Sequence, residues 1–206
     1  MKTPLSIQII YWLANIAFWL MVLIATVLFI LNLIFLTDVF TDTIQLRIQM
    51  PVPIEVVEEG KLFLSDAVQT VRIEEAYGKL YLVDTPFYIT KMVTRVLFIV
   101  VLLGLFMTWR FKQFITNIKK GLLFESENIK NLKQIAYGLL ALWLSTKIYM
   151  EVIYRALIKY LDFDSIIIGE YVNNYNGLLI FSIALWALAH VFVKGLEMKE
   201  EQNLTI

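Results

Sequence analysis

Four charged side chains recur at intervals of four residues in the otherwise apolar third quarter of the sequence. They are Lys147, Glu151, Arg155 and Lys159. Residues four apart are neighbours on the surface of an α-helix, so these side chains form one charged stripe. A charge inside a hydrocarbon layer is costly without a partner, so we predict that Glu151 bridges to one of the nearby cations.

Two further cations, Lys91 and Arg95, lie in the segment before Trp109 and reach a similar depth in the membrane. Lys147 lies 14 residues after Lys133, and Arg95 lies 14 residues before Trp109. At a rise of 1.5 Å per residue, both are about 21 Å from the basic connection between their helices. The candidate ligand-binding residues are therefore Lys91, Arg95, Lys147, Glu151 and Arg155.

Two interpretations of these charges stay open. In one, they line an outward-open polar cavity that binds an anionic group, such as a lipid head group or an anionic peptide. In the other, the long side chains reach to the outer membrane interface, and one ion pair ties two helices together.

A second group of candidates surrounds a basic connection at residues 110–133, which has six basic and two acidic residues. Ser126 is the predicted N-cap of the following helix, because its hydroxyl can accept from the unpaired first-turn N–H groups. The lysines can lie against anionic lipid or form a docking surface for a cytoplasmic partner. The docking candidates are Lys119, Lys120, Phe124, Asn128, Lys130 and Lys133.

The composition excludes several classes of protein. The 206 residues are 59% hydrophobic, against about 45–50% for a soluble domain. The chain has no cysteine, one histidine and a formal charge of zero, so thiol chemistry, His-rich metal sites and direct nucleic-acid binding are not expected. No nucleophile–base motif occurs in a plausible context, so we expect neither catalysis nor a cofactor.

The apolar segments predict a membrane bundle of four helices. The spans are expected at about Ile9–Leu36, Phe87–Trp109, Gln134–Ile158 and Gly177–Val193, since about 20 apolar residues cross a bilayer. The predicted organisation is a first transmembrane helix in 1–37, a β-rich segment in 38–86, and helices two to four in 87–206 with a tail at 194–206.

Alternating polar and apolar residues between the first two helices predict three or four short strands, beginning with Thr43–Met50. Gly60 and Gly78 are expected to separate strands. This small module is either a lid that senses a ligand or a structural cap on the bundle.

The charges of the loops set the orientation. Residues 38–84 have four basic and nine acidic residues, whereas the 110–133 connection is basic. Lys and Arg are retained on the cytoplasmic side, so we predict an extracytoplasmic β cap and cytoplasmic N- and C-termini.

Two motifs resemble a known family. One is Gly121-x-x-Phe124-x-x-Glu127-Asn128, followed by basic residues. The other is Phe192-x-x-Gly195-x-x-Met198, followed by the ending Glu201 to Ile206. With the four-span layout, they resemble the bacterial membrane proteins grouped as domain of unknown function 2975. Here Leu123 and Glu125 stand where that family often has Pro and Ser or Thr.

The resemblance implies location in the bacterial cytoplasmic membrane and association with a helix-turn-helix regulator, beside which such proteins are often encoded. The leading hypothesis is thus a non-enzymatic sensor or regulator that couples an extracytoplasmic or lipid-derived signal to that partner. The alternative is a transporter-like or immunity protein that binds lipid or peptide in a basic outer-leaflet cavity. Membrane lipid is an expected partner in both, and the sequence sets no oligomeric state.

Overall fold

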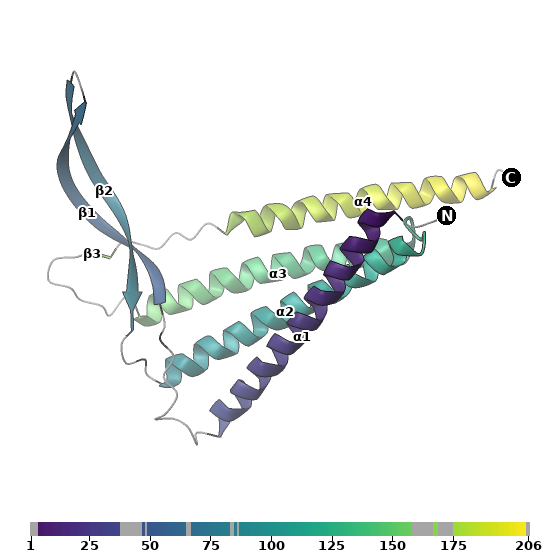
Figure 1. Cartoon of the computed structure of the whole chain (residues 1–206), viewed down its shortest axis with the longest axis horizontal. Helices are drawn as coiled ribbons and strands as arrows, with labels where there is room; N and C mark the ends of the chain where they lie inside the picture. Colours follow the sequence, from purple (N-terminus) through teal and green to yellow (C-terminus); the bar gives the residue numbers. More distant parts are fainter. Residues whose placement is uncertain are drawn as a thin grey trace. The chain divides into compact units, whose positions relative to one another are not determined.

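A computed structural model describes residues 4–37, 47, 49–64, 67–82, 85, 87–157, 167–168 and 175–204. These residues form four helices and three strands (Figure 1). In chain order they are α1 (Leu5–Leu36), β1 (Gln49–Leu64), β2 (Ala67–Tyr81), α2 (Phe87–Lys119), α3 (Ser126–Leu157), β3 (Ile167–Ile168) and α4 (Asn176–Leu204). The prediction of a mainly helical protein with a small β region between its first two helices is confirmed.

The chain divides into two compact units. The first contains 1–41, 91–147 and 174–206, and the second contains 42–90 and 148–173. α1, α4 and most of α2 and α3 therefore belong to the first unit, whereas the strands belong to the second.

Three helices are long and apolar enough to cross a membrane: Leu5–Leu36, Phe87–Lys119 and Asn176–Gln202. Their surfaces expose many large apolar side chains, among them Leu23, Leu102 and Ile183. Such extensive apolar exposure suits contact with lipid and not with water. The third predicted span lies in α3 as far as Leu157, and Ile158 is outside the described residues. α3 is long enough to cross a membrane but contains Lys147 and Glu151 and is not among the three.

Small residues allow the helices of the first unit to approach closely. A Cβ added at Gly104 of α2 would overlap the side chain of Met21 in α1. A Cβ added at Gly138 of α3 would lie 2.6 Å from Cγ of Met107 in α2. Close packing at small residues is how membrane helices gain van der Waals contact without a hydrophobic driving force between them.

α3 and α4 are joined by a similar close contact. The Ser182 hydroxyl of α4 donates a 2.8 Å hydrogen bond to the Ala136 carbonyl of α3. Nearby, Leu132 of α3 and Ala189 of α4 are buried in a cluster with Phe114 and Ile115 of α2. The core of the first unit therefore lies toward the end of α2 and the start of α3.

The second unit is built on one long hairpin and not on several short strands. β1 and β2 pair antiparallel from Gln49↔Tyr81 to Leu64↔Ala67, with a register shift between Glu55 and Glu58. β3 pairs with β1 at Ile54 and Glu55, giving the order β2-β1-β3. Of the predicted strand Thr43–Met50, most lies outside the described residues.

The expectation that Gly60 and Gly78 separate strands is wrong. Both lie inside strands and are paired, Gly60 with Val71 and Gly78 with Val52. A Cβ at Gly78 would lie 2.5 Å from Cδ1 of Ile54, so the glycine marks a close approach of side chains and not a turn.

Candidate functional site

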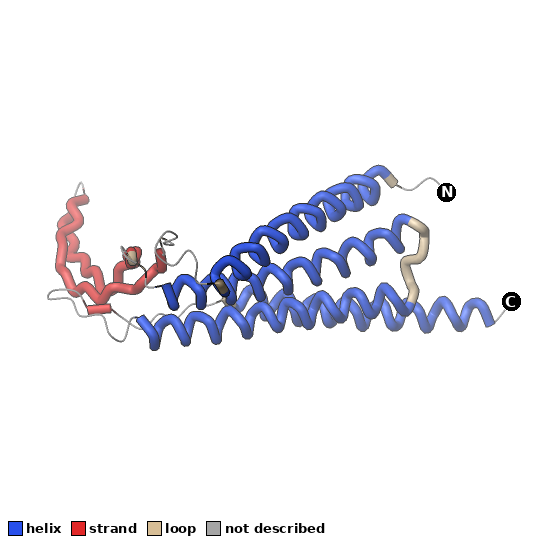
Figure 2. The backbone as a smooth tube through the Cα atoms, turned by 90° about the horizontal axis from the view of Figure 1, so that it is seen from below, coloured by secondary structure: helices blue, strands red, loops and turns tan. Residues whose placement is uncertain are grey.

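The connection between α2 and α3 is a short turn, Lys120–Glu125, seen as the tan loop in Figure 2. Most of the predicted 110–133 connection is thus helical. α2 ends in a Schellman motif, in which Leu122 N–H donates to the Asn117 carbonyl at 3.0 Å and Gly121 N–H to the Ile118 carbonyl at 2.9 Å. Gly121 has φ +81°, a left-handed conformation that glycine adopts without a Cβ penalty.

α3 begins one residue earlier than the predicted N-cap at Ser126 implies. Ser126 is its first helical residue, so Glu125 takes the capping position. The Glu125 carbonyl accepts from Asn128 N–H at 3.0 Å and from Ile129 N–H at 3.3 Å. Backbone hydrogen bonds therefore continue from both helix ends into this turn.

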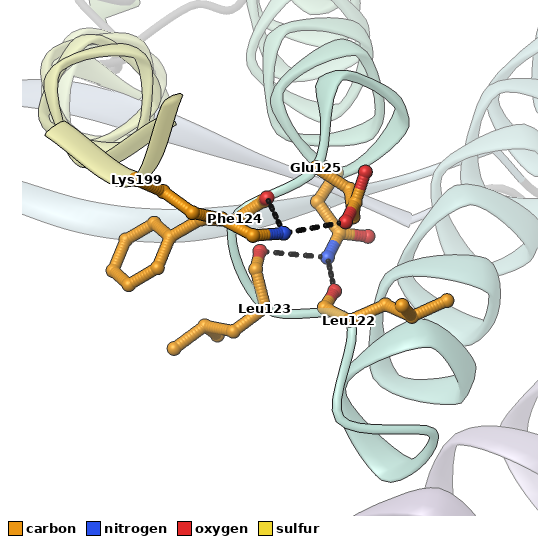
Figure 3. Close-up of polar contacts among 6 residues, drawn as sticks. Leu122, Leu123, Phe124, Glu125 and Lys199 are labelled. Atoms are coloured by element: carbon orange, nitrogen blue, oxygen red, sulfur yellow. Dashed lines mark hydrogen bonds and ion pairs between the residues drawn. The ribbon is translucent and has the colours of Figure 1, made fainter. Parts of the chain in front are cut away.

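Asn128 holds the turn from inside. Its amide nitrogen donates to the carbonyls of Leu122 at 2.6 Å and Leu123 at 2.9 Å (Figure 3). Its carbonyl oxygen accepts from the Asn117 amide at 2.9 Å. The residue is fully buried, so one side chain fixes the turn to the end of α2 and to the start of α3.

The tail of α4 lies against this turn. The Phe124 ring packs on Gly195, where an added Cβ would overlap it, and is 5.5 Å from the Phe192 ring centre. Phe192 also packs on Phe114 of α2, with ring centres 5.8 Å apart. Aromatic rings at these separations are in favourable contact.

One ion pair closes the contact. Lys199 Nζ lies 2.8 Å from a Glu125 carboxylate oxygen and 3.4 Å from the Phe124 carbonyl oxygen (Figure 3). Both side chains are partly exposed, so the pair is open to solvent and salt. We name this contact the Phe124 clasp, and its members are Phe124, Glu125, Phe192, Gly195 and Lys199.

The clasp brings together the two motifs that the sequence singled out. Phe124 comes from the first, and Phe192 and Gly195 come from the second. Gly121 and Asn128 of the first motif shape the turn that carries Phe124. The model of the family described as Protein of unknown function (DUF2975) matches residues 67–206, which include both. The chain belongs to the DUF2975 family. No curated protein and no solved structure matches the chain.

The DUF2975 match begins within the β1–β2 hairpin and ends with the chain, so α2, α3 and α4 lie wholly inside it. The clasp is therefore formed entirely by the matched region. α1 lies outside that region, although it packs on α2 through Met21 and Gly104.

The predicted docking residues differ in how far their side chains are exposed. Lys120 and Lys130 are exposed, and Lys119 lies with Nζ 4.0 Å from the ring centre of Tyr11 in α1. Lys133 and Phe124 are half-buried. Asn128 is fully buried, so it shapes the turn that a partner would contact.

The predicted ligand-binding residues lie elsewhere. Lys91 and Arg95 are one turn apart on α2, with Lys91 half-buried and Arg95 exposed. Lys147 on α3 is exposed, and its Nζ is 5.0 Å from the Trp143 ring centre. Glu151 and Arg155 follow on α3 in the second unit. The ion pair of Glu151 and the outer cavity stay predictions, and Lys159 lies outside the described residues.

Sequence reasoning missed Lys199 and Asn117. Phe192, Gly195 and Lys199 are spaced at i, i+3 and i+7, which places them on one face of a helix. That spacing could have marked Lys199 as part of the tail motif. No spacing in the sequence marks Asn117. Its hydrogen bond to Asn128 depends on the geometry of the turn between α2 and α3, which the sequence does not show.

The described residues include no group of three or more His, Asp or Glu side chains that could hold a metal ion. The clasp is a non-covalent contact between chain segments 74 residues apart. It consists of the packing of Phe124 on Phe192 and Gly195 and of the contacts of Lys199 with the Glu125 carboxylate and the Phe124 carbonyl.

Proposed function

We propose that this DUF2975 protein is a non-enzymatic sensor or regulator of the bacterial cytoplasmic membrane. It spans the membrane several times, with both termini inside, and couples an extracytoplasmic or lipid-derived signal to a cytoplasmic partner such as a helix-turn-helix regulator. Three helices of membrane-spanning length and composition support the location. The basic 110–133 connection supports the orientation.

The Phe124 clasp is the observation that carries this proposal. A turn and a tail from distant parts of the chain form one surface, with exposed Lys120 and Lys130 beside it. Cationic side chains next to a defined apolar contact suit a partner with an acidic docking face. In this proposal the tail leaves the turn by breaking the exposed ion pair, the contact of Lys199 with the Phe124 carbonyl, and the packing of Phe124 on Phe192 and Gly195.

In this mechanism, a signal that alters the packing of α3 against α4 changes the population of the closed clasp. The Ser182–Ala136 hydrogen bond and the Leu132–Ala189 contact lie along the interface that such a change must cross. The closed clasp holds the partner at the membrane, and the open clasp releases it.

The proposal is tested by co-purification with a candidate helix-turn-helix regulator. Three proteins are compared: the wild type, a variant with Lys120 and Lys130 both changed to Glu, and a chain that ends at Lys194. The regulator should be retained by the wild type and lost from both variants. Retention by all three would contradict a docking role for the turn and tail.

A matched control makes the same two Lys-to-Glu changes in the β1–β2 hairpin, away from the turn and the tail. Lys61 and Lys79 are exposed on β1 and β2, and changing both to Glu removes the same charge from the predicted opposite side of the membrane. This control should retain the regulator as the wild type does.

A further inference from the structure

One member of the first motif, Glu127, takes no part in the clasp. It is exposed on the first turn of α3 and lines a cavity of about 310 Å³ in the first unit. Its lining includes two aromatic side chains, Phe18 from α1 and Trp109 from α2. A volume of this size is at the lower end of the range for small-molecule sites.

The lining offers one cation and one acid. Lys112 faces the cavity with Nζ 4.6 Å from the ring centre of Phe18, and Glu127 supplies a carboxylate. A net neutral lining with separated charges matches a zwitterion better than a simple anion.

Two amides in the lining are already oriented by their other contacts. The Gln113 carbonyl accepts from Arg110 at 3.0 Å, which leaves its NH₂ group as a donor toward an anion. The Asn117 amide nitrogen donates to Asn128, which leaves its carbonyl oxygen as an acceptor toward an ammonium group. The lining therefore offers Lys112 with Gln113 to an anion and Glu127 with Asn117 to a cation.

The position of the cavity along α2 indicates that its ligand is a lipid head group. Trp109 ends the apolar part of α2, and Arg110 and Lys112 follow at once. Tryptophan at the end of an apolar run is typical of the membrane interface, which is where lipid head groups lie.

We propose that this cavity binds a phosphoryl group linked to a primary ammonium, the chemistry of a phosphoethanolamine head group. The phosphoryl group contacts Lys112 and Gln113, and the ammonium contacts Glu127 and Asn117. A primary ammonium is favoured over a quaternary one because both of its partners are hydrogen-bond acceptors. This site rests on the proposed membrane location and is independent of regulator binding.

The test is a titration of the detergent-purified full chain, followed by native mass spectrometry. The probes are phosphatidylethanolamine, phosphatidylcholine, phosphatidylglycerol and soluble phosphoethanolamine. The wild type should bind phosphatidylethanolamine about tenfold more tightly than phosphatidylcholine, the equivalent of one charge-assisted hydrogen bond. Competition by soluble phosphoethanolamine would assign the same site to a free ligand, whereas binding of the lipid alone assigns it to the membrane.

The variants separate the two halves of the ligand. Glu127→Gln should weaken phosphatidylethanolamine about tenfold and leave phosphatidylglycerol unchanged, whereas Lys112→Met should weaken both. Lys112→Arg keeps the positive charge and should bind both lipids as the wild type does. Such binding would show that the chain folds with a different side chain at this position. Exposed Lys61→Met and Glu200→Gln are the matched controls. Equal affinity of wild type and Glu127→Gln for phosphatidylethanolamine would overturn the proposal, whatever the regulator does.

Discussion

The ring of Phe124 lies directly against the backbone of Gly195, in the space that a larger residue would fill. Phe124 stands in the turn between α2 and α3, and Gly195 in the last third of α4. This contact is the reason that a glycine suits a position within the long α4 helix, where glycine costs about 1 kcal/mol relative to alanine.

Gly195→Leu should open the clasp. The new side chain competes with the Phe124 ring, and overpacking of this kind costs about 1–3 kcal/mol. The Tm of the purified protein in detergent should fall by several degrees. Gly177→Leu is the matched control, because nothing lies within 4 Å of a Cβ at Gly177. Equal Tm values for the two variants would contradict the packing described for the clasp.

Asn128 and Asn131 offer a second test, because they share residue type and full burial but differ in bonding. Asn128→Leu removes a side chain that bonds Asn117 and two turn carbonyls, and should cost about 1–3 kcal/mol for each group left unpaired. Both amide atoms of Asn131 lack a hydrogen-bond partner among the described residues.

Asn131→Leu should therefore be neutral or stabilising, since it removes a buried amide that gains no hydrogen bond. Thermal unfolding of both variants in the same detergent checks the difference in sign. A loss of stability in Asn131→Leu as large as that in Asn128→Leu would show that the Asn131 amide is satisfied in solution.

The predicted orientation can be measured directly, because the chain has no native cysteine. Single cysteines are placed at Gly60 in β1, at Lys120 in the turn and at Gln202 in the tail. A membrane-impermeant maleimide should label Gly60→Cys in intact cells, and the other two only after permeabilisation. Labelling of Lys120→Cys in intact cells would invert the proposed topology.

The sequence predicted the helices well because their signal is local. Long apolar runs mark α1, α2 and α4 without knowledge of any contact. The charged interval after Trp109 was predicted as a connection, but α2 continues through it to Lys119. The position of the β region between the first two helices was predicted correctly, but several short strands were expected where β1 and β2 form one long hairpin. Gly60 and Gly78 resemble strand breaks, yet pairing with the opposite strand keeps both inside one hairpin.

The site was predicted only in part. Phe124 and Asn128 were found from the first motif, but their partners Gly195, Lys199 and Asn117 depend on how the chain folds back on itself. Side-chain type and spacing cannot show that a turn meets a tail 74 residues away. For the same reason, the pairing of Glu151 with a cation stays a prediction.

In the proposed function, the closed clasp, fastened by Lys199 and Glu125, holds the cytoplasmic regulator. Purified regulator is titrated onto the protein in lipid nanodiscs for the wild type, Glu125→Lys, Lys199→Glu and the double exchange. Each single change puts like charges together and should weaken binding about tenfold, the equivalent of about 1.4 kcal/mol. The double exchange restores the pair.

The double exchange should recover most but not all of the affinity, because a lysine at position 125 faces the positive end of the α3 dipole. Lys194→Glu, which breaks the exposed pair with Glu197 inside α4, is the control and should bind as the wild type does. We expect loss of binding in both single variants and recovery in the double exchange. Equal binding by all four proteins, or a double exchange as weak as either single change, would contradict this expectation.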